Sequence, residues 1–289
     1  NASPAQAQIV GFNISGACPQ TIKVFSELPA IVDSLSIRAY TQPGGLPNDS
    51  AYVDNATICI QLQPASSGST VTNGLRFAPS DTTSTFDVSG LAIGGFDRGI
   101  RIEDGNYTIT GNFIGVDADG ATQRANAYDG IAVYASNSYF ATTRRVGGSD
   151  PAQRNVIVGN GTGVTLVSGG ANEVSNNFIG TATNGTTAAG NVDGIYVSSL
   201  SNYIHGNTIS GNLGAPIRIE GANAAANSIS FNRIGLKSVS LCLFPPCAPD
   251  YDALANAGDG VRLASGAAGN NISANDIAWN GGDGISRPD

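Results

Sequence analysis

One short pattern recurs along most of this chain and constrains its fold more than any other feature. The pattern is an apolar residue, two variable residues, an asparagine, one variable residue and an isoleucine or valine, followed by a turn and an apolar pair. Its anchors are Asn112, Asn155, Asn177, Asn207, Asn232 and Asn275. The closest two, Asn155 and Asn177, lie 22 residues apart. Such a period is typical of a solenoid in which each repeat forms one coil, and the longer intervals indicate loops inserted at fixed corners.

Each repeat offers three short strands, because apolar residues recur two apart and such residues share one face of a strand. The last strand of each repeat carries the pairs Ile100 and Ile102, Ile131 and Val133, Val164 and Leu166, Ile195 and Val197, Ile217 and Ile219, and Val261 and Leu263. The middle strand supplies Ile114, Ile157, Ile179, Ile209, Ile234 and Ile277, and the first supplies Ile109, Val174, Ile204, Ile229 and Ile272. Stacked coils would turn these residues into aliphatic columns.

A single coil cannot cover its own apolar face, and parallel pairing with the coils above and below also satisfies the backbone. The sequence therefore predicts an all-β chain, a single-stranded right-handed parallel β-helix of about seven coils with three short strands per coil. The anchor asparagines are expected to turn inward at a bend. There they would bond backbone groups and the asparagines of adjacent coils, since buried amides need partners.

The repeat is less regular before residue 71. Residues 1–70 are predicted to be an N-terminal capping region, and residues 71–289 a continuous β-helix, because a solenoid needs its open ends covered. At the other end Gly284-Ile285 begins another coil that stops at Asp289. This pattern favours an uncapped C-terminal end, with either a continuation of the polypeptide or self-association there.

Charge and composition exclude some classes of partner and some classes of fold. The formal charge of −8 would repel nucleic acid and anionic membrane surfaces, so neither is expected as a partner. No apolar run reaches the about 18 residues that a membrane span needs. The 38 glycines and 12% charged residues do not resemble an ordinary helical enzyme, and turn dipeptides between short apolar runs favour β structure.

Four cysteines suit two disulfides in an exported protein. The C-L-F-P-P-C spacing favours a local Cys242–Cys247 bond, which leaves Cys18 to pair with Cys59. Zinc binding and free buried thiols are the alternatives, but the chain has only one histidine and no second close cysteine pair. The expected location is extracellular or at the cell surface.

Three stretches, Ser36 to Asn48, Asn112 to Asn126 and Asn177 to Asn191, resemble right-handed parallel β-helix repeat proteins of bacterial secreted and cell-surface polypeptides, in the pectate-lyase-like superfamily. The resemblance implies a strand and a Thr-Gln-Pro-Gly turn at the start of the helix, and coils with long loops. Through its carbohydrate-active members the superfamily also implies a polysaccharide or cell-surface glycan as partner.

On the last strand of each repeat, the outward positions gather a mixed patch of Tyr134, Tyr196, Arg218, Glu220 and Arg262. Tyrosine rings could stack on sugars, and guanidinium groups could pair with the carboxylates of uronates. We name these five residues the glycan-binding candidates. The competing interpretation is a solvated sheet with cross-strand ion pairs.

Aspartates open another possibility. Asp-Gly steps at Asp129, Asp193, Asp259 and Asp283 recur before the last strand. The carboxylates of Asp117, Asp119, Asp129 and Asp193 are candidates for binding calcium, which prefers several oxygen ligands. Turn formation, with the aspartate bonding its own backbone and the glycine at positive φ, is the favoured interpretation.

Two functions follow. The first is a structural or adhesive module with a glycan-binding sheet face. The second is a polysaccharide lyase or glycoside hydrolase acting on an acidic polysaccharide. No cofactor is predicted for the chain, and calcium is the alternative. No adjacent pair of aspartates provides the two carboxyl groups of a glycosidase, and the single histidine, His205, is most simply a surface side chain. The first function is therefore preferred.

Overall fold

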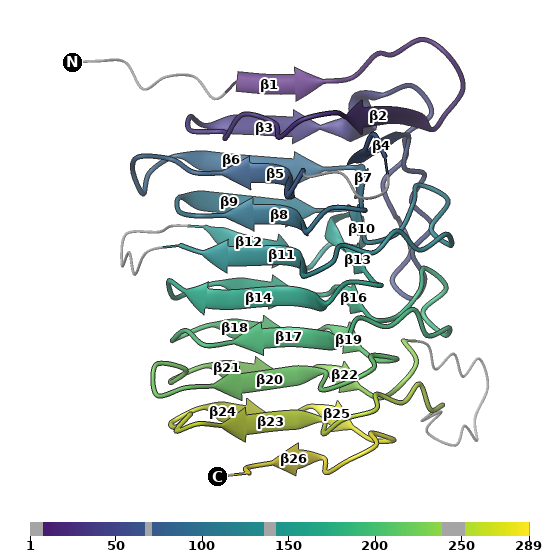
Figure 1. Ribbon diagram of the computed structural model, residues 1–289. Helices are drawn as coiled ribbons and strands as arrows, with labels where there is room; N and C mark the ends of the chain where they lie inside the picture. The colour runs from purple at the N-terminus through teal and green to yellow at the C-terminus, as the bar shows by residue number, and fades with distance from the viewer. Residues whose placement is uncertain (1–7, 67–70, 136–142, 239–251, 289) are drawn as a thin grey trace.

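The chain winds into a single column of stacked coils, as Figure 1 shows. The computed structural model describes residues 8–66, 71–135, 143–238 and 252–288. Three parallel sheets, here called A, B and C, run the length of the column, with 9, 9 and 8 strands. From β3 onward the path passes from sheet A to sheet B to sheet C in each turn, and the winding is right-handed (Figure 1). The fold is therefore the predicted parallel β-helix.

The strands of each sheet come from successive coils. Sheet A contains β1 (Gln8–Gly11), β3 (Leu35–Arg38), β6 (Thr85–Ser89), β9 (Asn106–Thr110), β12 (Arg144–Gly147), β15 (Glu173–Ser175), β18 (Tyr203–His205), β21 (Ser228–Ser230) and β24 (Asn271–Ser273). Sheet B contains β2 (Gln20–Val24), β4 (Ile60–Pro64), β7 (Leu91–Ile93), β10 (Phe113–Ile114), β13 (Val156–Ile157), β16 (Phe178–Ile179), β19 (Thr208–Ile209), β22 (Arg233–Ile234) and β25 (Asp276–Ile277). Sheet C contains β5 (Asn73–Phe77), β8 (Arg98–Ile102), β11 (Asp129–Tyr134), β14 (Thr162–Ser168), β17 (Asp193–Val197), β20 (Ile217–Glu220), β23 (Val261–Ala264) and β26 (Ile285–Ser286).

The number of coils differs from the prediction of about seven, because sheets A and B each hold 9 strands. The additional coils come from the segment predicted as a cap: β1 pairs with β3, and β2 with β4, all in parallel register. These strands lack the asparagine anchor, which is why the repeat is not visible in the sequence there. Whether this segment also acts as a cap stays a prediction.

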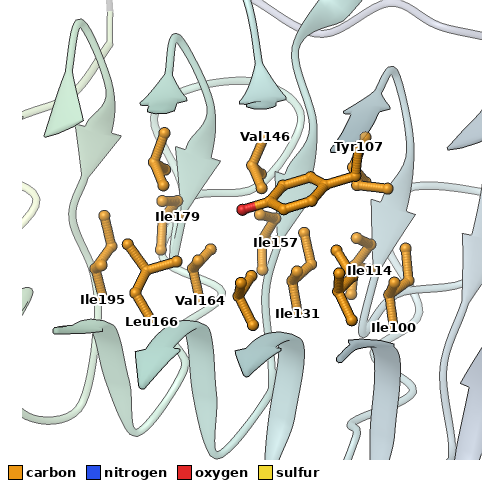
Figure 2. Close-up of a cluster of buried hydrophobic side chains, with 14 of the residues drawn as sticks. Ile100, Tyr107, Ile114, Ile131, Val146, Ile157, Val164, Leu166, Ile179 and Ile195 are labelled. Carbon is orange, nitrogen blue, oxygen red and sulfur yellow. The ribbon is translucent and has the colours of Figure 1, made fainter. Parts of the chain in front are cut away.

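The interior consists of aliphatic columns. Ile157, Ile179 and Ile209 are 0% exposed and lie in register on β13, β16 and β19, as predicted. Figure 2 shows Ile157 and Ile179 together with Val146 of sheet A and with Ile131 and Val164 of sheet C. Each coil thus buries the apolar side chains of its neighbours, which supplies the main favourable free energy of such a fold.

The anchor asparagines form the expected ladder at the bend between sheets A and B. The backbone N–H and Nδ2 of Asn155 both donate to Oδ1 of Asn177, at 3.2 and 2.8 Å, and Asn177 repeats these bonds with Asn207. Two further ladders were not predicted. They run through Asn126, Asn160, Asn191, Asn212, Asn256 and Asn280, and through Asn172, Asn202, Asn227 and Asn270.

The prediction that the glycines of the Asp-Gly steps have positive φ is wrong. Gly130, Gly194 and Gly260 do not occupy the left-handed region. Instead, a Cβ on Gly130 would lie 2.7 Å from the carbonyl oxygen of Gly163 in the next coil, closer than real Cβ atoms approach. The glycines are required by the close stacking of coils at this corner, not by a turn conformation.

Loops cover the outer face of sheet B. Phe113, Val156 and Phe178 alternate with the interior isoleucines and point outward, yet they are at most 3% exposed. They pack in a second apolar cluster with residues of the loops, including Tyr40 and Ala118. Sheet B is therefore covered over β10, β13 and β16, whereas its outward residues Arg233 and Asp276 in later coils are partly exposed. Two 3-10 turns, η1 (Ala39–Thr41) and η2 (Pro151–Gln153), lie between strands of sheets A and B: η1 follows β3, and η2 lies between β12 and β13.

The predicted Cys18–Cys59 disulfide is present, with an S–S distance of 2.00 Å. It joins the first coil to the start of β4. Cys242 and Cys247 lie outside the described residues, so their pairing stays a prediction. Within the described part of the chain, no helix has the length and apolar character needed to cross a membrane.

Candidate functional site

The outer face of sheet C carries a column of side chains that points away from the interior. Strand register aligns Arg101 with Ala132, Thr165, Tyr196, Arg218 and Arg262 in consecutive coils. This alignment is the one expected from the alternation of apolar residues. The face therefore presents three of the five glycan-binding candidates, Tyr196, Arg218 and Arg262, on three successive coils.

Tyr196 and Arg218 form the centre of this group. The guanidinium carbon of Arg218 lies 4.7 Å from the centre of the Tyr196 ring, within the range of a cation–π contact. Arg218 also approaches Asp193 at 3.7 Å and Glu220 at 3.8 Å. Both distances are longer than a hydrogen bond. The guanidinium is thus held in place by charge and by the ring, while its side chain stays 37% exposed.

Glu220 and Arg262 lie one coil apart and line a shallow hollow with Ser265 and Pro288. Arg262 is exposed. Glu220 accepts a hydrogen bond of 3.3 Å from the hydroxyl of Ser265. Together with the Tyr196 and Arg218 pair, this hollow extends the candidate surface toward the last described coil.

Tyr134 belongs to a separate cluster. The register shifts between Val133 and Tyr134, so that Tyr134 lies opposite Ser168 instead of continuing the expected column. The guanidinium of Arg101 lies 5.0 Å from the centre of the Tyr134 ring. Arg101 in turn pairs with Glu103 at 3.0 Å. The five candidates therefore form two groups on one face, separated by the coil that contains Thr165.

A further ion pair borders the cluster of Tyr134, Arg101 and Glu103. Arg76 and Glu103 make two hydrogen bonds, of 2.9 and 3.0 Å. The hydrogen bond from Arg76 and the positive charge of Arg101 outweigh the effect of burial and hold the pKa of Glu103 below its ordinary value. Cross-strand ion pairs, which the competing interpretation expected, are thus present beside the aromatic rings.

The four calcium candidates do not converge. Asp117 accepts hydrogen bonds from Arg124 at 2.8 Å and Gln61 at 2.9 Å. Asp119 closes a turn by accepting the backbone N–H groups of Ala121 and Thr122. Among the residues that the structure describes, no three histidine, cysteine, aspartate or glutamate side chains are grouped as a metal site would require.

The other two candidates, Asp129 and Asp193, bond between coils. Asp129 accepts from Arg98 at 3.0 Å and from the Thr165 hydroxyl at 2.6 Å. Asp193 accepts the backbone N–H of Ala215 at 3.0 Å. Their Asp-Gly steps therefore do not form the self-bonded turns that were expected, because the carboxylates reach the neighbouring coil.

Asp129 and Asp193 also line a hollow at the edge of sheet C that the sequence analysis missed. It contains Tyr128, which is 58% exposed, and Val192, which is 56% exposed. Arg98 lies 5.4 Å from the centre of the Tyr128 ring. The signal for this corner is the asparagine of the second ladder, because Tyr128 lies two residues after Asn126 and Val192 lies directly after Asn191.

Comparisons of the chain with protein-family models, with curated proteins and with solved structures yield no match.

Proposed function

We propose that this chain is a glycan-binding module of an exported or cell-surface protein, and that the outer face of sheet C holds a linear acidic polysaccharide. The observation that carries the proposal is the Tyr196 and Arg218 pair, with the guanidinium carbon 4.7 Å from the ring centre. A ring and a guanidinium, both half-exposed and fixed on adjacent coils, offer a stacking surface and a partner for a carboxylate.

The geometry of the column suits a polymer. Successive coils of a parallel β-helix are spaced by roughly 4.8 Å, so Tyr134 and Tyr196, two coils apart, lie on strands separated by roughly 10 Å. A sugar chain that runs along the column axis would pass these rings at a separation similar to the length of a disaccharide. Sheet C is also the face bordered by Tyr128, whose ring adds a third aromatic contact.

Charge favours an acidic ligand on this face despite the overall charge of −8. Arg101, Arg218 and Arg262 follow one outward column. The Nε of Arg218 is buried, while the ion pairs of its guanidinium, 3.7 Å to Asp193 and 3.8 Å to Glu220, are longer than hydrogen bonds. A uronate carboxylate could therefore bond with this guanidinium without displacing an established hydrogen bond.

The disulfide between Cys18 and Cys59 supports an exported location, since such bonds persist in oxidising compartments. The resemblance to β-helix repeat proteins of bacterial surfaces supports the same location. It also supports a role as a spacer or adhesive segment, in which a long regular column presents a binding face away from the cell.

The alternative is a polysaccharide lyase or hydrolase. It is favoured by the hollow that contains both Asp129 and Asp193, which lie two coils apart in register. A hydrolase needs one carboxylic acid that gives up a proton and one carboxylate. Both oxygens of Asp129 accept hydrogen bonds, from Arg98 and Thr165, which favours a structural carboxylate. Binding without cleavage is therefore the preferred function.

The test is retention of polysaccharides by affinity electrophoresis, with polygalacturonate and alginate as acidic ligands and dextran as a neutral one. We expect retardation by the acidic polymers, and a loss of at least about tenfold in affinity for Arg218→Ala, equivalent to about 1.4 kcal/mol. Arg38→Ala, which removes an exposed arginine from sheet A, is the matched control. Equal retardation of both variants would remove sheet C from consideration, and new reducing or unsaturated ends would favour the enzyme.

A further inference from the structure

A second hollow lies on the outer face of sheet A, away from the proposed glycan site. It has a volume of about 380 Å³ and is lined by β12, β15 and β18 and their flanking residues. Its lining includes the polar side chains of Arg145, Glu173, Tyr203 and His205, with Thr143 and Arg144 at its border. We call it the sheet A hollow. Its size is at the lower end of pockets that hold small ligands, which is enough for one sugar ring.

Glu173 is the centre of the hollow. Its Oε1 accepts a hydrogen bond of 2.9 Å from the Ser175 hydroxyl and lies 3.1 Å from Nε2 of His205. Its Oε2 lies 3.3 Å from Nε of Arg145. Three neighbours from three consecutive coils therefore hold the carboxylate in one orientation. Groups fixed in this way lose little conformational entropy when a ligand binds.

The charges of the hollow nearly cancel. Arg144, whose side chain is buried, pairs with Asp104 at 3.0 Å, and Arg145 pairs with Glu173. The formal charges of these two ion pairs therefore sum to zero. The hollow thus offers no strong attraction to an anion or a cation, but it does offer fixed hydrogen-bond donors and acceptors.

Tyr203 supplies the apolar surface. It lies next to Glu173 in the strand register and is 54% exposed, although it stands on a regular strand where a smaller polar residue occurs in other coils. An exposed ring beside fixed polar groups matches a sugar, which has an apolar face of C–H groups and an edge of hydroxyls.

We propose that the sheet A hollow binds one ring of a neutral glycan, stacked on Tyr203 and hydrogen-bonded to Arg145 and Glu173. This site is independent of the acidic-glycan face on sheet C, because the two sets of residues stand on different sheets. The chain would then hold two kinds of glycan at once, one on each open face of the column.

His205 provides a direct probe, since it is the only histidine of the chain and lies in the hollow. The imidazole proton signals of the protein are followed by NMR at fixed pH while cellohexaose, xylohexaose or mannohexaose is added. We expect a saturable shift of the His205 signals with at least one of these neutral oligosaccharides. Tyr203→Ala should weaken binding by at least about tenfold, whereas Tyr203→Phe, which keeps the ring, should bind nearly as the unmodified protein does.

Two controls separate this proposal from the proposed function. Tyr196→Ala on sheet C should leave the oligosaccharide-induced shift of the His205 signals unchanged. Melting temperatures equal to that of the unmodified protein should show that the Tyr203 variants are folded. The proposal is overturned if no neutral oligosaccharide gives a saturable shift, if Tyr203→Ala binds as well as the unmodified protein, or if only oligogalacturonate shifts the signals. Failure of acidic-glycan binding on sheet C would not alter the expected result here.

Discussion

The hydroxyl of Tyr107 donates a hydrogen bond of 2.8 Å to Oδ1 of Asn172, and both residues are 0% exposed. Tyr107 stands on β9, and Asn172 precedes β15, so the ring spans the intervening coil. Figure 2 shows the ring lying among the aliphatic columns. This bond begins the third asparagine ladder, because the backbone N–H and Nδ2 of Asn172 both donate to Oδ1 of Asn202.

Replacement of Tyr107 by phenylalanine should destabilise the fold. The substitution keeps the buried ring but removes the hydroxyl donor, which leaves the Asn172 oxygen without that hydrogen bond in a dry interior. Such a loss costs about 1–3 kcal/mol. Urea unfolding followed by circular dichroism should show this decrease in the free energy of unfolding. Tyr203→Phe, at an exposed ring, should change stability by less than about 0.5 kcal/mol, and equal effects of the two variants would contradict the assignment.

Replacement of Gly130 by alanine should also destabilise the protein. The new Cβ would lie 2.7 Å from the Gly163 carbonyl oxygen, so adjacent coils would have to separate locally, at a cost of about 1–3 kcal/mol. Gly284, in the last described coil, is the matched control because its added Cβ would meet nothing closer than 3.8 Å. Thermal unfolding of Gly130→Ala and Gly284→Ala should therefore differ clearly. Similar melting temperatures would show that coil stacking does not require the glycine.

Much of the fold could be predicted from the sequence because the interior pattern is redundant. Ile157, Ile179 and Ile209 each follow an asparagine at the same spacing, so one missing element does not hide the repeat. The first coils do not show this pattern in the sequence and were therefore not predicted. Their strands, such as Gln20–Val24 and Ile60–Pro64, alternate polar and apolar residues without an anchor, and alternation alone does not distinguish a solenoid coil from any other strand.

The candidate site was predicted less well, because outward side chains depend on local register. The column that includes Tyr196 and Arg218 follows directly from strict alternation. Tyr134 does not, since the irregularity after Val133 moves it without any change in the apolar pattern. Contacts such as Arg101 over Tyr134 arise from side-chain reach between coils, which a one-dimensional pattern does not contain.

The loop over sheet B contains a buried acid. Asp54 is 8% exposed, and its Oδ2 has no hydrogen-bond partner in the described structure. Burial raises the pKa of Asp54 to about 6, although a hydrogen bond from the Ala56 backbone and the charge of Arg154 oppose the increase. Arg154 donates to the carbonyl groups of Ser50, Ala51 and Val53, which holds the loop on the column.

This acid should make stability depend on pH. The pKa of Asp54 is about 6 in the folded protein and about 3.9 when unfolded, so the folded state favours the protonated form. The stabilisation is present in full below about pH 4 and is lost as the pH rises through about 6, by about 3 kcal/mol. Asp54→Asn, which stays neutral, should lack this contribution.

Chemical unfolding of both proteins at several pH values checks the difference. The free energy of unfolding of the variant minus that of the unmodified protein should become more positive between about pH 4 and pH 7. Taking the difference cancels the contributions of the other carboxylates. A difference that does not change with pH would mean that Asp54 is ionised in the folded protein throughout this range.

We propose that sheet C binds an acidic glycan, and a crystal structure of the protein with hexagalacturonate tests this proposal. We expect an oligosaccharide that runs along the column across β17, β20 and β23, with one ring on Tyr196 and a carboxylate at Arg218 or Arg262. An oligosaccharide bound only on another face, or an empty sheet C at a concentration that saturates binding in solution, would contradict it.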